Sequence, residues 1–187
     1  GLGVLLSQAP QCVTSNGARV CGYSCVENGS AAACAQTPQG VCGKSASQVA
    51  CFDPPLWLGA LGLSGLPKPA CLGDGGNLAC GYDCRREGGR VACAQTPKGR
   101  CEANYGSLTC LDPTPETYAV LQGDVPAPKC LAQDGRVGCG YACVASAGRI
   151  ACARTPFGDC QENGGTPVCF DPPKEVICAK GKSVPKP

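Results

Sequence analysis

The stretch CGYDCRREGGRVACAQTPKGRCEANYGSLTC, residues 80–110, decides how this chain folds. Its cysteine spacing occurs twice more, at residues 21–51 and 139–169, and each copy has a further cysteine upstream. Every module therefore has the form C-x8-C-x3-C-x8-C-x7-C-x8-C, and the modules start at Cys12, Cys71 and Cys130. The constant offset of 59 residues identifies a tandem repeat without insertions.

The composition is typical of a disulfide-rich protein from an oxidising compartment. The 187 residues include 19 cysteines but no histidine or methionine, and the formal net charge is only +2. Cross-links then substitute for a large hydrophobic core, as in small extracellular domains. We therefore expect a secreted, extracellular or cell-surface protein. The near-neutral charge argues against nucleic acid as a partner, and the apolar residues 1–6 are too few to span a membrane.

Tight turns in the middle of the eight-residue gaps predict β-hairpins. Between Cys12 and Cys21 the midpoint is Asn16-Gly17, which suits a type I′ turn because both central residues need a positive φ. Counting outward from this turn places the two cysteines in a non-hydrogen-bonded pair. The Cα atoms of such a pair lie about 4.5 Å apart, at the short end of the disulfide range. Every midpoint except Ala46-Ser47 contains glycine, so the prediction covers all three modules.

The hairpins favour disulfides between cysteines that are neighbours in the sequence. Six cysteines per module allow 15 connectivities, and bridges between neighbouring hairpins remain an alternative. The favoured pairs are Cys12–Cys21, Cys25–Cys34, Cys42–Cys51, Cys71–Cys80, Cys84–Cys93, Cys101–Cys110, Cys130–Cys139, Cys143–Cys152 and Cys160–Cys169. The predicted fold class is all-β, small and disulfide-rich, with three tandem six-cysteine modules of short antiparallel hairpins joined by ordered connectors.

The segments between the modules are predicted to be ordered. The chain divides into an N-terminal connector segment (1–11), module 1 (12–51), a connector (52–70), module 2 (71–110), a connector (111–129), module 3 (130–169) and a C-terminal connector segment (170–187). Both internal connectors have 19 residues and carry large apolar side chains, such as Trp57 and Tyr118, that need cover. We expect them to pack on the modules and to fix a rigid repeat.

A Thr-Pro-x-Gly turn occupies the seven-residue gap of each module. Proline at the second position and glycine at the fourth are typical of a type I turn. We expect Gly40, Gly99 and Gly158 to take the left-handed conformation that closes a three-residue hairpin loop. The residue between proline and glycine varies, and it is Gln39, Lys98 or Phe157. Multi-headed protease inhibitors vary a single exposed residue in this way, but this turn position tolerates most residues in any case.

The residues offer little for catalysis or metal binding. Without histidine there is no Ser-His-Asp or Cys-His constellation. Asp53, Asp112 and Asp171 are single carboxylates before proline, where a local Asx-type turn is the expected role. The close cysteine pair is C-x3-C rather than the C-x2-C of structural zinc sites, so disulfides are favoured over metal. We expect no enzymatic activity, no cofactor and no metal site.

Two further features of the sequence concern contacts between elements. The tyrosine of each C-G-Y-x-C segment is expected to pack against a disulfide or a connector rather than to stack on a ligand. These tyrosines are Tyr23, Tyr82 and Tyr141. Cys178 lies outside the six-cysteine frame, and it is either a free thiol or the site of an intermolecular disulfide.

The elements C-G-Y-x-C, C-A-Q-T-P-x-G-x-C and C-F-D-P-P resemble the cysteine-rich repeats of predicted secreted bacterial proteins. The likeness covers the modules and not the connectors. It implies an exported protein, and it brings no assigned activity with it.

The sequence favours a non-enzymatic structural protein of the cell exterior, a rigid disulfide-stapled rod that assembles head to tail into a filament or surface layer. Its partners would be other copies of the chain or other surface proteins. The residues expected at the assembly contact are Leu2, Val4, Leu5, Leu6, Val176 and Ile177. The alternative is a secreted binding module, either a multi-headed protease inhibitor or an adhesin, that presents the Thr-Pro-x-Gly loops.

Overall fold

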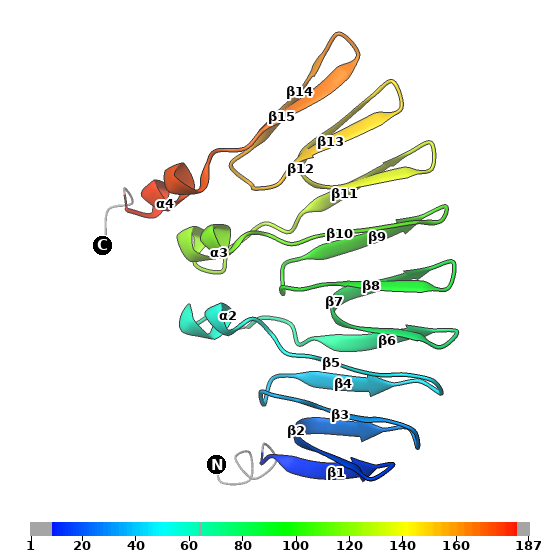
Figure 1. The fold of residues 1–187 in the computed structure, drawn as a ribbon. Coiled ribbons are helices and arrows are strands. Elements are labelled where there is room, and N and C mark those ends of the chain that lie inside the picture. Colours follow the sequence, from blue (N-terminus) through cyan, green and yellow to red (C-terminus); the bar gives the residue numbers. More distant parts are fainter. Residues whose placement is uncertain (1–8, 64, 183–187) are drawn as a thin grey trace.

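The computed structural model describes residues 9–63 and 65–182. Within these residues, antiparallel hairpins follow one another in a single stack, and their turns lie along one edge (Figure 1). A short helix from each connector lies along the opposite edge (Figure 1). Each module contributes one three-stranded sheet and one two-stranded sheet. The predicted fold class, a small disulfide-rich all-β repeat, is confirmed.

The strands have the same order in every module. Module 1 contains β1 (Gln11–Ser15), β2 (Ala18–Glu27), β3 (Ala32–Ala35), β4 (Val41–Lys44) and β5 (Val49–Phe52). Module 2 contains β6 (Ala70–Asp74), β7 (Asn77–Glu87), β8 (Arg90–Ala94), β9 (Arg100–Asn104) and β10 (Ser107–Leu111). Module 3 contains β11 (Lys129–Gln133), β12 (Arg136–Ser146), β13 (Arg149–Ala153), β14 (Asp159–Asn163) and β15 (Thr166–Phe170). The helices are α2 (Leu56–Ala60), α3 (Pro115–Leu121) and α4 (Lys174–Lys182).

All nine disulfides join cysteines that face each other in one hairpin. Cys12 pairs with Cys21 across β1 and β2, and this register repeats in the other hairpins. The Cα atoms of the bonded pairs are 3.9–4.1 Å apart, as narrow antiparallel pairs require. The connectivity is the nearest-neighbour pattern that the turn positions favour.

Most of the hairpin turns have the backbone that the sequence predicts. In seven of the nine, both central residues have a positive φ, as in Asn16-Gly17 with 50° and 79°. The two exceptions lie in module 1 and use a side chain instead. Asn28 Oδ1 accepts hydrogen bonds from the backbone N–H groups of Ser30 and Ala31. Ser45 Oγ accepts from the backbone of Gln48, so Ala46-Ser47 turns without a positive φ.

A bulge within the C-G-Y-x-C segment lets one long strand serve two hairpins. The register of β2 with β3 shifts between Tyr23 and Val26, and β7 and β12 repeat the shift. The residue before the second cysteine takes a left-handed backbone, with φ of 53° at Ser24, 46° at Asp83 and 52° at Ala142. The left-handed residues themselves are not glycine, so the signal for the bulge in the sequence is the glycine two residues earlier, Gly22, Gly81 or Gly140, inside the long strand.

Hydrogen bonds between successive turns hold the hairpins in one stack. Asn16 Nδ2 donates to the carbonyl of Ser30, and Arg136 Nη1 donates to that of Gly148, each at 3.0 Å. Similar bonds cross both module boundaries. Ser45 Oγ donates to Gly76 O at 3.1 Å, and Ser107 Oγ donates to Gly135 O at 3.3 Å. The modules therefore form a continuous column rather than separate beads.

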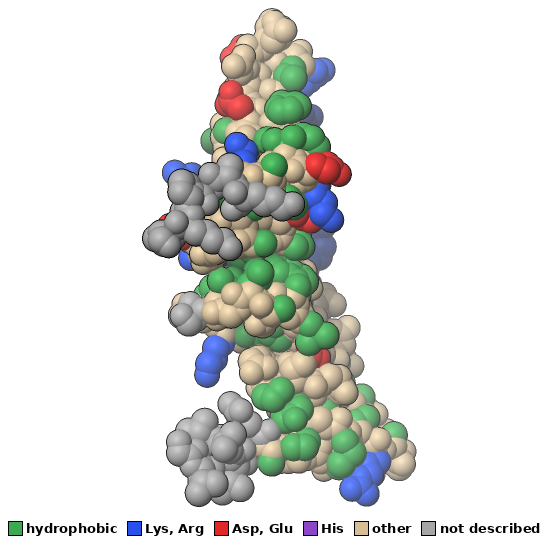
Figure 2. Space-filling model, turned by 90° about the vertical axis from the view of Figure 1, so that its left-hand side faces the viewer, with side chains coloured by type: hydrophobic (Ala, Val, Ile, Leu, Met, Phe, Trp, Pro, Cys, Tyr) green, Lys and Arg blue, Asp and Glu red, His purple; other side chains and the backbone are tan. Residues whose placement is uncertain are grey.

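The connectors are ordered, as predicted, but they contain helices that were not predicted from the sequence. Thr114 caps α3 by accepting a hydrogen bond from the backbone of Thr117, and proline follows at the first helical position. Leu58 of α2, Tyr118 of α3 and Val125 form a buried apolar cluster. Apolar side chains recur along this edge of the stack (Figure 2). Within the described residues, no helix is long and apolar enough to cross a membrane.

Candidate assembly interface

The contact between successive modules is built around one tyrosine and one apolar residue. Phe52, at the end of β5, meets Tyr82 of the next module edge to face, with 5.6 Å between ring centroids. Leu111 packs in the same way on the cluster that contains Tyr141. Burial raises the pKa of both tyrosine hydroxyls, so they stay neutral in the folded protein. Tyr82 and Tyr141 therefore pack within the contacts between modules, as predicted.

The disulfides themselves form the rest of the contact between modules. The Sγ atom of Cys80 lies 3.5 Å from the carbonyl oxygen of Ala50 in the preceding module. A Cβ placed on Gly43 would lie 2.7 Å from Cys71 Cβ, so glycine is needed there for close approach. The modules thus meet face to face through sulfur, glycine and aromatic surface.

The last module leaves its half of this contact uncovered. Phe170 stands at the repeat position of Phe52 and Leu111, yet its side chain is 68 % exposed. Val168, two residues earlier and on the same face of β15, is 54 % exposed. Together they form an apolar surface that has no cover among the described residues.

The first module leaves the complementary half uncovered. Tyr23 is only half-buried and Cys21 is exposed, whereas Tyr82 and Cys80, at the same repeat positions, are buried. Arg19 occupies the position of Leu78 in module 2, so this surface is also more polar than its internal counterpart. We name the surface of Tyr23, Cys21 and Arg19 the head face and that of Phe170 and Val168 the tail face.

The assembly residues predicted from the sequence are not those of the head and tail faces. Leu2, Val4, Leu5 and Leu6 fall outside the described residues. Val176 is half-exposed on α4, but Ile177 is only 3 % exposed, and α4 packs against α3. Ile177 is therefore occupied within the chain and is not free for a contact with another copy. Sequence reasoning did not find the tail face, because only two residues, one on each side of Cys169, form it.

Cys178 is the free cysteine of the described residues, and it is exposed on α4. Its position on a surface helix leaves both alternatives, a free thiol or an intermolecular disulfide, open to it.

The Thr-Pro-x-Gly turns are held by the aspartates that recur before proline. Asp112 accepts hydrogen bonds from the backbone N–H of Gln95 and from both the N–H and the hydroxyl of Thr96, at 2.8–3.0 Å. Asp53 and Asp171 do the same in their own modules. The expected local Asx-type turn is therefore wrong. Each carboxylate reaches 16 or 17 residues back along the chain and caps a separate turn.

The glycine of these turns is needed for a different reason from the one predicted. Gly99 N donates to Thr96 O at 3.0 Å, as a type I turn requires, but its φ is not positive. A Cβ on Gly99 would lie 2.2 Å from Asp112 Oδ1 and 2.5 Å from Ala94 Cβ. The expected left-handed conformation is thus wrong, and the carboxylate cap excludes any side chain.

The connectors partly cover the loops that the inhibitor hypothesis needs exposed. Lys98 donates its backbone N–H to the hydroxyl of Tyr118 at 2.8 Å, and its side chain is half-buried. In module 3 the ring of Phe157 lies under the ammonium group of Lys180, 5.6 Å from it. Loops that bind a protease must present their variable residue to the partner. The geometry therefore favours a structural role for these turns.

Tyr118→Phe is expected to lower the stability of the chain by about 1–2 kcal/mol. The hydroxyl of Tyr118 is buried, where it donates to Thr96 Oγ1 and accepts from Lys98 N. The variant leaves the Lys98 N–H without its acceptor and removes the donor to Thr96 Oγ1, which keeps its own bond to Asp112. Guanidinium unfolding followed by circular dichroism measures the change. Tyr105→Phe is the control, because the Tyr105 side chain is 88 % exposed. Equal stability of the two variants would contradict the bracing role of the Tyr118 hydroxyl.

The described residues contain no cluster of three or more His, Cys, Asp or Glu side chains placed to hold a metal ion. Comparisons with protein-family models, curated proteins and solved structures found no match to this chain. Function is therefore argued from the geometry of the stack and its two end faces.

Proposed function

We propose that this protein is a non-enzymatic extracellular structural protein whose hairpin stack assembles head to tail into a filament or surface layer. The nine disulfides call for an oxidising environment, which is the basis for placing the protein outside the cell. Each recurrent aspartate is engaged in capping a turn, so none is offered for acid–base chemistry.

One observation carries the proposal. The tail face of one copy and the head face of another are the two halves of a contact that the chain already makes twice internally. If module 1 of a second copy followed module 3 at the repeat spacing, its Tyr23 would lie against Phe170, as Tyr82 lies against Phe52 within the chain. A heterologous contact of this kind leaves a free head and a free tail after each addition, so further copies can add and extend it into a filament.

At one position the contact between copies would pair two polar side chains, which the internal contacts, Gly43 with Leu78 and Glu102 with Val137, do not do. Gly43 lies near Leu78, because a Cβ placed on this glycine would be 3.6 Å from Leu78 Cδ1. Gln161 and Arg19 are the repeat equivalents of these two residues at the tail and the head. In a head-to-tail pair, Gln161 would therefore face Arg19, and its side-chain oxygen can accept from the guanidinium. A Gln161–Arg19 pair would therefore occur only in the contact between copies, because the internal contacts have other residues at these positions.

The assembly is tested with two variants that each spoil one face. Phe170→Ser removes the tail face and Tyr23→Ser removes the head face, both in a Cys178→Ser background that excludes intermolecular disulfides. We expect the Cys178→Ser parent to form polymers as its concentration rises, and each variant alone to stay monomeric. A mixture of the two variants retains one good head and one good tail, so it should form dimers and stop there.

Light scattering coupled to size-exclusion chromatography and negative-stain microscopy provide the measurement. Tyr105→Ser is the control, because it removes an exposed aromatic side chain far from both faces and should polymerise like the parent. A parent protein that remains a monodisperse monomer at high concentration would overturn the proposal. Polymers that persist in the Phe170→Ser variant would show that another surface makes the contact.

A further inference from the structure

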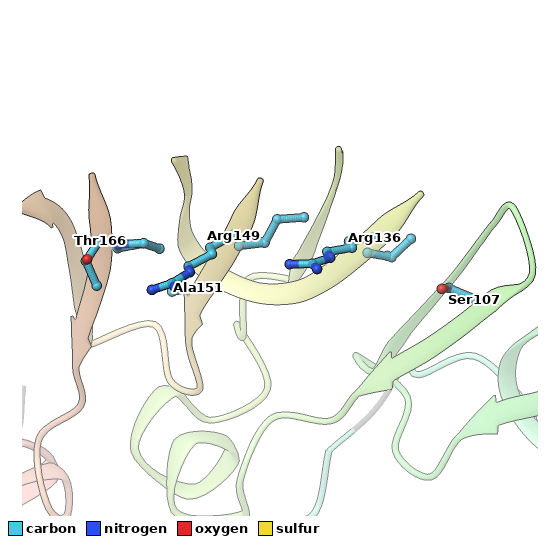
Figure 3. A pocket seen from close by; sticks show the side chains of 8 residues that line it. Ser107, Arg136, Arg149, Ala151 and Thr166 are labelled. Atoms are coloured by element: carbon cyan, nitrogen blue, oxygen red, sulfur yellow. The ribbon is translucent and has the colours of Figure 1, made fainter. Parts of the chain in front are cut away.

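A shallow hollow of about 560 Å³ lies on the flank of module 3, close to the turn edge of the stack. Four polar residues line it in a row, and each is the first residue of the strand that leaves a hairpin turn. These residues, which we name the turn-exit row, are Ser107, Arg136, Arg149 and Thr166. Figure 3 shows them side by side on successive hairpins.

The floor of the hollow is aliphatic. Val137, Ile150 and Pro167 each follow a member of the turn-exit row and contribute apolar side chains to the lining. No acidic and no aromatic side chain is among the lining residues. Two guanidinium groups therefore stand over an uncharged surface that offers them no carboxylate partner.

The two arginines differ in how they are engaged. Arg136 donates from Nη1 to the carbonyl of Gly148, which directs its guanidinium toward the next hairpin. Arg90, at the position of Arg149 in module 2, donates likewise to the carbonyl of Gly106. Across residues 9–63 and 65–182, the Arg149 side chain makes no such bond to a turn carbonyl. The guanidinium N–H groups of Arg149 are thus available to a ligand. Arg136 uses one guanidinium nitrogen for its bond to Gly148, and its other N–H groups are also available.

We propose that the turn-exit row binds a linear anionic polysaccharide, with carboxylate or sulfate groups seated on Arg149 and Arg136. A guanidinium presents paired donors that match the oxygens of such anions. At the two ends of the row, the hydroxyl of Thr166 can exchange hydrogen bonds with sugar hydroxyls, and that of Ser107, which donates to Gly135 O, can still accept one. The aliphatic floor covers the C–H surface of the sugar rings, and the row follows successive hairpins, as a linear polymer requires.

Other anionic polymers fit the hollow less well. Single-stranded nucleic acid relies on aromatic side chains for base stacking, and the lining has none. An acidic peptide carries few hydroxyl groups of its own to match the hydroxyls of Ser107 and Thr166 at the two ends of the row. Arg136 and Arg149 belong to β12 and β13 rather than to β15, which carries the tail face, so binding through these two residues does not require head-to-tail assembly.

Binding is measured by calorimetry at low salt on the full chain with Phe170→Ser and Cys178→Ser, which removes avidity if filaments form. The probes are heparin for sulfate, polygalacturonate for carboxylate, neutral dextran, polyglutamate and single-stranded DNA. We expect binding to heparin or polygalacturonate and none to dextran. The stronger of the two identifies the anionic group.

Arg149→Gln should weaken this binding about tenfold, as expected for one charge-assisted hydrogen-bonding group. Arg154→Gln is the matched control, because it removes the same charge just beyond the opposite end of β13 and should leave the affinity unchanged. Arg136→Gln should also weaken binding, and a melting curve separates this effect from loss of its bond to Gly148. Equal losses in the 149 and 154 variants would overturn the proposal. So would polyglutamate or DNA binding as tightly as the polysaccharides, or no binding at all.

Discussion

Replacing Cys101 and Cys110 together with alanine is expected to destabilise the chain by roughly 4 kcal/mol. Closing a loop of about ten residues contributes about 2.5–3 kcal/mol in the chain-entropy model. Cys101 is fully buried in the cluster with Tyr82 and Ala94, so its sulfur is also core, and losing it adds about 1–2 kcal/mol. Guanidinium unfolding followed by circular dichroism measures the sum.

The chain offers a matched control for this experiment. The Cys12–Cys21 disulfide has the same sequence separation of nine residues, so its removal has the same loop-closure effect. Both of these cysteines are exposed, however, and their removal leaves no hole in a core. The Cys12→Ala, Cys21→Ala variant should therefore lose only about 2.5–3 kcal/mol. If the two double variants were equally stable, sulfur burial would contribute nothing to the module.

Gly99→Ala is expected to destabilise the chain by about 3–4 kcal/mol, although it adds a single methyl group. The added Cβ would overlap Asp112 Oδ1 and the side chain of Ala94, which is fully buried and cannot retreat. The carboxylate must then leave the turn, and its bonds to Gln95 and Thr96 are lost. Hydrogen bonds to a charged group are worth about 1.5–3 kcal/mol each, and partial relaxation offsets part of the sum.

Two comparisons make the Gly99→Ala result decisive. Gly59→Ala, in α2, meets no atom within 4 Å, so thermal unfolding should show no loss and a slight gain. Asp112→Asn should lower stability by about 1–2 kcal/mol, because the amide keeps one acceptor but not the charge. In the double variant the losses should fall short of their sum, since both remove the same cap. Full additivity would show that the glycine matters for another reason.

The sequence was a good guide wherever structure depends on neighbouring residues. Asn16-Gly17 specifies its own turn, and the turn sets the register that brings Cys12 to Cys21. The turn prediction was weakest at Ala46-Ser47, which contains no glycine, and there Ser45 Oγ stabilises the turn by accepting a hydrogen bond from Gln48 N. These features need no knowledge of the rest of the chain.

Features that depend on distant residues could not be predicted in this way. The left-handed backbone of Ala142 has no local cause, because alanine does not favour it. Asp112 precedes a proline, which suggested a local turn, yet its partners lie in another loop. Among the features missed, α3 had a readable signal in Thr114 and the proline after it. The two end faces became visible only when equivalent positions could be compared for exposure.

The short span of every disulfide also governs how the chain can be made. Each bond joins cysteines nine positions apart, so none waits for a residue synthesised much later. A chain entering an oxidising compartment from its N-terminus can therefore close one hairpin at a time and settle it on the hairpin before. Such local closure limits the exchange between wrong thiols that slows the maturation of proteins with long-range disulfides. Oxidation can then proceed in one direction along the chain, in step with its entry into such a compartment.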